Sequence, residues 1–167
     1  MQGLIATPAP AALWFLPFAV PVALWVAWSD MKFMKIPNKA VMALVGVYLV
    51  VGPIALPLED WAWRWLHLAV VLVTGFVMNL GRLIGAGDAK FAAAMAPFFA
   101  LGDLRLALAL LAASLIGAFA SHRGLGLVPP FRNATADWES WRRRDFPMGL
   151  ALSGMLILYL LLAVFDA

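Results

Sequence analysis

The chain has 167 residues, of which 65% are apolar and 13% charged, and its formal net charge is only +3. Soluble domains usually contain about 45–50% apolar and about 25% charged residues, so this composition excludes an ordinary soluble domain and indicates a protein that lives in a lipid bilayer. Cysteine is absent, which excludes disulfides, cysteine-bound zinc, iron–sulfur clusters and thiol nucleophiles. Because no long polar stretch leaves room for a soluble domain, we expect one polytopic membrane domain over residues 1–167.

Apolar stretches along the chain predict the membrane spans. Five of them approach the roughly 17–25 residues that a helix needs to cross the hydrocarbon core. They are Ala11–Trp28, Ala40–Leu58, Trp65–Ile84, Leu104–Ala120 and Met148–Phe165. A sixth run, Ala89–Leu101, is short and contains Pro97, so we expect an incomplete or tilted span that packs against other helices. The prediction is an all-α integral membrane protein with about six transmembrane helices.

The distribution of basic residues predicts the orientation of these helices. Ten lysines and arginines lie between the first and second, the third and fourth, and the fifth and sixth predicted spans. They are Lys32, Lys35, Lys39, Arg82, Lys90, Arg123, Arg132, Arg142, Arg143 and Arg144. Only Arg64 and Arg105 lie on the opposite side. Because cytoplasmic loops carry an excess of Lys and Arg, we expect these three loops in the cytoplasm and both termini outside.

The longest polar segment, Ser121–Pro147, contains Trp138 and Trp141 beside a run of arginines. We interpret it mainly as an anchor at the headgroup level, while a role in gripping a substrate stays open. His67 and His122 lie near predicted helix ends on opposite sides of the membrane, where each fits an interfacial polar tip. A metal site is therefore not expected, and neither a cofactor nor a nucleic-acid partner is indicated.

Two of the nine acidic residues stand out as functional candidates, because carboxylates near a bilayer are costly. The other seven fall in outer loops, at the C-terminus or among the arginines of the long loop, where ion pairs explain them. Asp30 lies at the cytoplasmic end of the first predicted helix. Asp88 lies at the cytoplasmic start of the fourth, in the segment Gly85-Ala86-Gly87-Asp88. The charge pattern therefore predicts both carboxylates at the same depth on the same side.

The chemistry of an aspartic peptidase requires two carboxylates that can approach each other. Such a pair shares one proton, so one oxygen activates a water while the protonated partner polarises the scissile carbonyl. Gly85 and Gly87 have no Cβ, which allows unusual dihedrals and lets an extended peptide lie close to the backbone. A structural alternative stays open, in which Asp88 and Asn38 only cap their helices and Asp30 is a polar helix end.

Three segments resemble the type IV prepilin peptidases, which are GxGD-type aspartic peptidases of the prokaryotic cytoplasmic membrane. They are Asp30 with Ile36-Pro37-Asn38, then Gly85-Ala86-Gly87-Asp88-Ala89-Lys90-Phe91, and finally Phe146-Pro147-Met148-Gly149. The resemblance implies that Asp30 and Asp88 are the catalytic dyad, that Gly85 and Gly87 shape the site, and that Lys90 contacts the substrate. The implied substrate is the leader of a type IV prepilin or pseudopilin, cut on the cytoplasmic side after a Gly.

The resemblance also implies a location and a subclass. The expected place is the bacterial inner membrane, with lipids and the prepilin as partners, and the oligomeric state stays open. Longer members of the family carry a zinc-binding cysteine insertion and methylate the new N-terminus. Here that insertion is missing, so we expect peptidase activity without methyltransferase activity or S-adenosylmethionine, as in the short tight-adherence (Flp) pilus subclass.

Two competing interpretations remain at this stage. Presenilin-like GxGD peptidases typically place a Tyr-Asp on the helix before the motif, whereas the third predicted helix here has no Asp and Ser29 precedes Asp30. The other alternative is a non-catalytic membrane subunit or a small cation- or proton-coupled transporter. A transporter site belongs near the bilayer midplane, so the depth of the two aspartates discriminates between the two classes.

Overall fold

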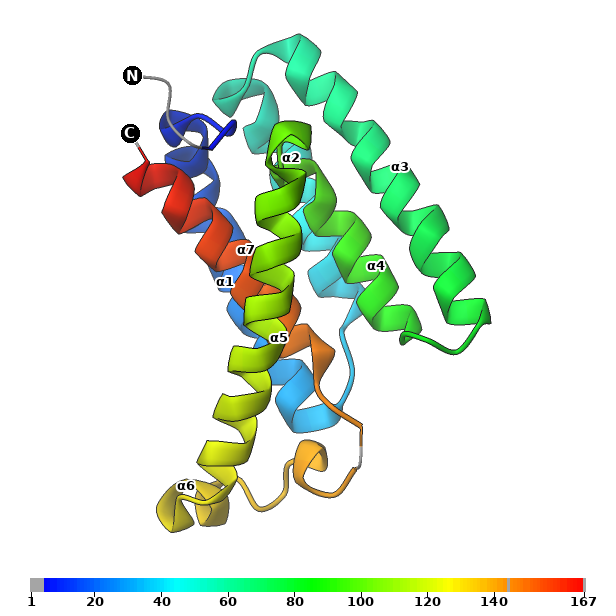
Figure 1. Cartoon of the computed structure of the whole chain (residues 1–167), viewed down its shortest axis with the longest axis vertical. Helices are drawn as coiled ribbons and strands as arrows, with labels where there is room; N and C mark the ends of the chain where they lie inside the picture. The colour runs from blue at the N-terminus through cyan, green and yellow to red at the C-terminus, as the bar shows by residue number, and fades with distance from the viewer. Residues whose placement is uncertain (1–4, 144, 167) are drawn as a thin grey trace.

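The computed structural model describes residues 5–143 and 145–166, and the regular elements of that part of the chain are all helical. The helices are α1 (Ala9–Phe33), α2 (Asn38–Ala55), α3 (Leu58–Leu80), α4 (Ala86–Met95), α5 (Leu104–Gly126), α6 (Pro129–Ala134) and α7 (Met148–Phe165). Three short 3-10 turns join them, η1 (Ala96–Phe98), η2 (Leu101–Asp103) and η3 (Glu139–Trp141). The long helices run back and forth along the longest axis of the molecule (Figure 1). All-α architecture is therefore confirmed for the described residues.

Five helices are long and apolar enough to cross a membrane, namely α1, α2, α3, α5 with the preceding turn η2, and α7. The prediction for α7 has the observed bounds, but α3 begins at Leu58 and not at Trp65. Pro57 lies at its N-cap, and acidic residues in its first turn interact favourably with the helix dipole. A prediction from apolar length alone excludes those charged residues, although they belong to the helix.

The sixth predicted span corresponds to α4 followed by the turn η1. With 10 residues, α4 is about 15 Å long, roughly half the thickness of the hydrocarbon core. It begins at Ala86, inside the Gly-rich segment, and it ends before Pro97, whose missing N–H cannot extend the helical hydrogen bonds. The polypeptide nevertheless returns along the bundle here, because α4 runs upward between α3 and α5 (Figure 1).

Small residues bring α1 and α7 together at the centre of the bundle. Buried alanines line α1, and α7 contributes Gly149, Ala151 and Ala163 to the same interior. Without a hydrophobic driving force in lipid, such close backbone packing is what holds membrane helices together. Aromatic rings fill the wider space beside it, where the centroid of the Phe15 ring lies 4.9 Å from that of Phe98.

Helix α3 is attached differently, because its backbone packs mainly against α4 and η1, while it meets α2 through the side chains of Trp61 and Trp65 around Tyr48. Its buried residues are only Arg64 and Gly75, and the rest of its surface is largely exposed Leu, Val and Phe. At Gly75 an added Cβ would lie 2.9 Å from the Cβ of Ala89, so the backbones of α3 and α4 are in close contact there. The apolar outer face suits lipid and would be unfavourable in water.

A buried polar cluster closes the upper end of the bundle in Figure 1, where α1 begins and α7 ends. We call Thr7, Arg64, Asp103 and Tyr159 the upper cluster. The Tyr159 hydroxyl donates to Oδ2 of Asp103 at 2.6 Å, and the Asp103 carboxylate also accepts the backbone N–H of Ala6 and Thr7. Arg64 Nη1 lies 3.4 Å from the Thr7 hydroxyl. Asp103 does lie in the connection between α4 and α5, but both Asp103 and Arg64 are buried in this network, which the sequence did not predict.

Candidate functional site

The lower end of the bundle contains an open cavity of about 540 Å³ that both candidate aspartates line. Asp30 reaches it from the last turns of α1, and Asp88 from the first turn of α4. The wall is completed by the end of α3 with the loop that follows it, and by residues just before and at the start of α7. The two carboxylates, distant in sequence, therefore share one cavity.

Asp30 is 5% exposed, and a backbone donor from another helix fixes its carboxylate. The Gly149 N–H, in the first turn of α7, donates to Asp30 Oδ2 at 2.7 Å. First-turn N–H groups have no partner within their own helix, and the positive end of the helix dipole favours a carboxylate there. A Cβ at position 149 would lie 2.9 Å from Asp30 Oδ2, so only glycine allows this approach.

Asp88 lies in the first turn of α4, whose N-cap is Gly85. A Cβ at Gly85 would lie 2.6 Å from Asp88 Oδ2, and one at Gly87 would lie 3.3 Å from the Cβ of Ile36. The glycines therefore serve close approach. The expectation of unusual dihedrals is wrong, because no glycine of the described residues has a positive φ and Gly85 is extended at φ −69°.

The helix-cap alternative can be compared with these geometries. The N-cap of α2 is Pro37 and not Asn38, and neither α2 nor α4 has a side-chain hydrogen bond at its N-cap. Asp88, outside the five helices of membrane-spanning length, is partly buried beside the cavity. That burial raises the pKa of the Asp88 carboxyl above its ordinary value of 3.8, and the Gly85 backbone opposes the shift.

Strained backbone is a further feature of this cavity. Among the described residues the non-glycine positions with positive φ are Met34, at 51°, and Arg82, at 57°, and both line the cavity. Left-handed backbone is unfavourable for such side chains, and it concentrates at functional sites where the surrounding structure enforces it. Next to Arg82, the Asn79 side chain donates to the Ile84 carbonyl at 2.8 Å and holds the loop between α3 and α4.

Sequence reasoning missed this strain, because neither Met34 nor Arg82 is a residue type that favours positive φ. The segment containing Gly149 was recognised, but nothing in it indicated a hydrogen bond to Asp30. Lys90 is exposed and is not among the residues that line the cavity. Its Nζ lies 3.4 Å from Asn38 Oδ1. Groups of three or more metal-ligating side chains that could hold an ion do not occur among the described residues.

Comparisons with known proteins identify a protein family for the part of the chain that contains both aspartates. The model of the type IV leader peptidase family matches residues 17–121, which is more than half of the chain. The matched range includes Asp30 and the whole Gly85–Asp88 segment, and it ends before the start of α7. Searches among curated proteins and among solved structures gave no match.

Proposed function

Because the chain belongs to the type IV leader peptidase family, we propose that it is a membrane-embedded aspartic endopeptidase that cuts the N-terminal leader from type IV prepilins or pseudopilins. The observation that carries this proposal is the single cavity lined by both Asp30 and Asp88. A peptidase of this kind needs no metal or cofactor, since two carboxyl groups supply both the base and the acid.

The proposed chemistry uses one proton shared by Asp30 and Asp88. The ionised carboxylate takes a proton from a water, whose oxygen attacks the scissile carbonyl carbon, while the protonated carboxyl hydrogen-bonds to the carbonyl oxygen. The C–N bond of the tetrahedral intermediate then breaks, and the leaving amine takes up a proton from the dyad. Gly149 N–H has a positioning role, because its hydrogen bond fixes the orientation of the Asp30 carboxylate.

The leader of the substrate is proposed to reach this site from the cytoplasm, while the apolar helix of the substrate stays in the membrane. The end of α1, the loop after α3 and the start of α7 line the cavity, and they lie at one end of the bundle (Figure 1). Most lysines and arginines belong to the connections at this end, which supports a cytoplasmic site under the positive-inside rule. The leader would lie against Gly85 and Gly87 and be cut after a Gly, with the apolar pilin helix packed laterally in lipid. Lys90, exposed near the start of α4, would contact a substrate carbonyl or carboxylate.

Methyltransferase activity is not part of the proposal. Only residues 34–37 separate α1 from α2, so the connection that carries the cysteine insertion in longer relatives is a tight turn here. The transporter alternative is less well supported, because Asp30 and Asp88 lie at one end of the bundle and not at its mid-length. The proposed location is the bacterial inner membrane.

Cleavage of a prepilin from the same genome tests the proposal. Purified protein in proteoliposomes is compared with Asp30→Asn and Asp88→Asn, which keep side-chain size but remove the titratable proton. Asp60→Asn serves as matched control, because Asp60 is an exposed acidic residue in the first turn of α3 at the opposite end of the bundle. We expect wild type and control to shorten the prepilin and both dyad variants to leave it at full length. Cleavage by either dyad variant at the wild-type rate would contradict the mechanism.

A further inference from the structure

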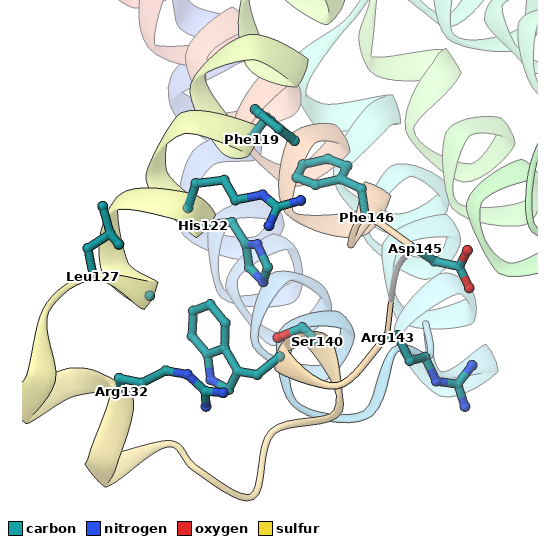
Figure 2. Close-up of a pocket in the computed structure, with 11 residues that line it drawn as sticks. Phe119, His122, Leu127, Arg132, Ser140, Arg143, Asp145 and Phe146 are labelled. Carbon is teal, nitrogen blue, oxygen red and sulfur yellow. The ribbon is translucent and has the colours of Figure 1, made fainter.

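A second cavity, of about 290 Å³, lies beside the one that holds the two aspartates. It is formed by the lower end of α5, the short helix α6, the turn η3 and the segment that leads into α7 (Figure 2). Arg143, Asp145 and Phe146 line both cavities. The proposed peptidase chemistry makes no use of this second cavity.

Three arginines give the cavity a positive lining. Arg123 and Arg132 each stack on an aromatic ring, with the guanidinium carbon 5.3 Å from the centre of the Phe119 ring and 4.9 Å from that of Trp141, respectively. Neither lies within ion-pair distance of a carboxylate of the described residues, whereas Arg143 is 3.6 Å from Glu139. Among the described residues that line the cavity, Asp145 is the one with an acidic side chain.

Two buried polar atoms in the same lining have no hydrogen-bond partner in the described part of the chain. They are Nε2 of His122, a residue 8% exposed, and Oγ of Ser140, 2% exposed. Leaving such a group without a hydrogen bond is unfavourable, so buried polar atoms of this kind usually have a partner. The sequence predicted an interfacial position for His122 but not its burial. In Figure 2 the His122 ring points from α5 toward the turn that carries Ser140.

The aromatic wall of the cavity holds these groups in place. The His122 ring stacks on Trp141 with a centroid distance of 4.5 Å and an angle of 18° between the planes. Trp141 is fixed in turn, because its Nε1 donates to the Thr135 hydroxyl at 3.1 Å. Donors held by stacking are preorganised, which lowers the entropy that a ligand must lose on binding.

Exposed apolar residues around the cavity indicate where it lies relative to the membrane. Leu127, which lines the cavity, is 84% exposed, and the neighbouring Val128 is also exposed. A polar cavity with an apolar rim at the end of a membrane-length helix fits the boundary between acyl chains and headgroups. We propose that this second cavity binds the phosphate group of an anionic lipid headgroup, with Arg123, Arg132, His122 and Ser140 around the phosphate oxygens.

Lipid binding to the purified full-length protein tests this proposal without any use of peptidase activity. Native mass spectrometry in detergent measures the affinity for phosphatidylglycerol and, for comparison, phosphatidylcholine. Arg123→Gln and Arg132→Gln are each expected to weaken phosphatidylglycerol binding about tenfold, because each removes a charge-assisted contact. Arg105→Gln is the matched control, since Arg105 is an exposed arginine at the opposite end of α5, and it should bind as wild type does.

A second variant tests the buried atoms separately from the charges. His122→Phe keeps a ring against Trp141 but removes both nitrogens, and we expect it to weaken binding several-fold while the thermal unfolding midpoint stays near that of wild type. Equal phosphatidylglycerol affinity in wild type, Arg123→Gln, Arg132→Gln and His122→Phe would overturn the proposal. Inorganic phosphate is the third probe: if it binds with the same dependence on these residues and phosphatidylglycerol does not bind, the lipid assignment is wrong and the ligand is a soluble phosphate.

Discussion

Buried carboxylates occur at both ends of this bundle, and their surroundings differ in one respect. At the upper end Asp103 accepts hydrogen bonds from the Tyr159 hydroxyl and from two backbone N–H groups. At the lower end Asp30 accepts one backbone hydrogen bond, from Gly149, and faces an open cavity with Asp88. Asp103 and Asp30 are almost equally buried, at 4% and 5% exposure. Burial alone therefore does not distinguish a carboxylate that accepts several hydrogen bonds from one that faces an open cavity.

The number of fixed donors makes this distinction. A carboxylate that accepts several hydrogen bonds from fixed donors is stabilised as a charge and has little acceptor capacity left for a water or a peptide. One that is only partly engaged keeps capacity for a substrate, at a cost to stability that the surrounding fold must offset. Substitutions at the lower end should consequently affect cleavage activity more than stability, and those at the upper end should affect stability more than activity.

The largest expected effect is on activity at the lower end. Asp30→Asn and Asp88→Asn should lower the cleavage rate by at least about a thousandfold with little change in thermal stability, because the proton that the dyad shares is lost. Asp103→Asn should retain the specific activity of the folded fraction. Rates of prepilin cleavage, normalised to folded protein from size-exclusion chromatography, measure this contrast. Equal loss of activity from Asp103→Asn would remove the distinction between the two ends.

The second effect concerns stability at the upper end. Asp103→Asn should lower the free energy of unfolding by about 2–3 kcal/mol. The neutral amide accepts weaker hydrogen bonds than the buried carboxylate does from Tyr159, Ala6 and Thr7. Tyr159→Phe, which removes one donor, should cost about 1–2 kcal/mol. Denaturation of the two variants in mixed micelles, followed by tryptophan fluorescence, gives both values. A Tyr159→Phe variant as stable as wild type would show that the cluster does not hold this end together.

Gly149→Ala tests the hydrogen bond that positions the Asp30 carboxylate at the lower end. The added Cβ would lie 2.9 Å from Asp30 Oδ2, so the carboxylate has to move and its hydrogen bond is lost. We expect the cleavage rate to fall about a hundredfold, since displacement of a reacting group by about 1 Å has effects of this size. Gly154→Ala is the matched control on the same helix, where the nearest atom would be the Ser114 hydroxyl at 3.7 Å. Similar rates for the two variants would contradict the positioning role of Gly149.

The pH dependence of cleavage should show that the dyad shares a proton. Below the range in which one carboxyl ionises there is no base, and above it the acid is lost, so the rate should pass through a maximum. Because burial raises the pKa of Asp88, the protonated partner persists to higher pH, and the alkaline side of the profile should lie above that of exposed carboxyls. A rate that does not change between about pH 4 and about pH 9 would be incompatible with a two-aspartate mechanism.

The smallest expected effect belongs to Lys90. Its side chain is exposed and lies outside the cavity, so Lys90→Gln should raise the KM for prepilin about threefold and leave kcat unchanged, as for a weak, solvent-screened contact. Lys39→Gln, an exposed lysine in the first turn of α2, is the control in steady-state assays at low salt. A large fall in kcat for Lys90→Gln would indicate a role in the chemistry itself.

Sequence alone predicted the features that depend on composition and charge. Apolar length gave the bounds of α7, and the uneven distribution of basic residues placed Asp30 and Asp88 at one end. Apolar length failed at the end of α1 and the start of α3, where polar residues continue the helix beyond the apolar stretch, and α3 ends at Leu80, before the predicted Ile84. Features that depend on three-dimensional packing, such as the upper cluster around Asp103, left no local signal, because its members are ordinary residues far apart in the chain.

The way α3 and α4 pack has a mechanical consequence for the dyad. Asp88 belongs to α4, whose backbone is in close contact with α3, and α3 is hydrogen-bonded to the rest of the bundle through Trp61, Arg64 and His67 in its first half. Asp30, in contrast, belongs to the tightly packed centre formed by α1 and α7. The separation of the two carboxylates is thus set by how two bodies fit together and not by the geometry of any one helix. We therefore expect lateral pressure from the acyl chains on the exposed face of α3 to alter the distance between the Asp30 and Asp88 carboxylates.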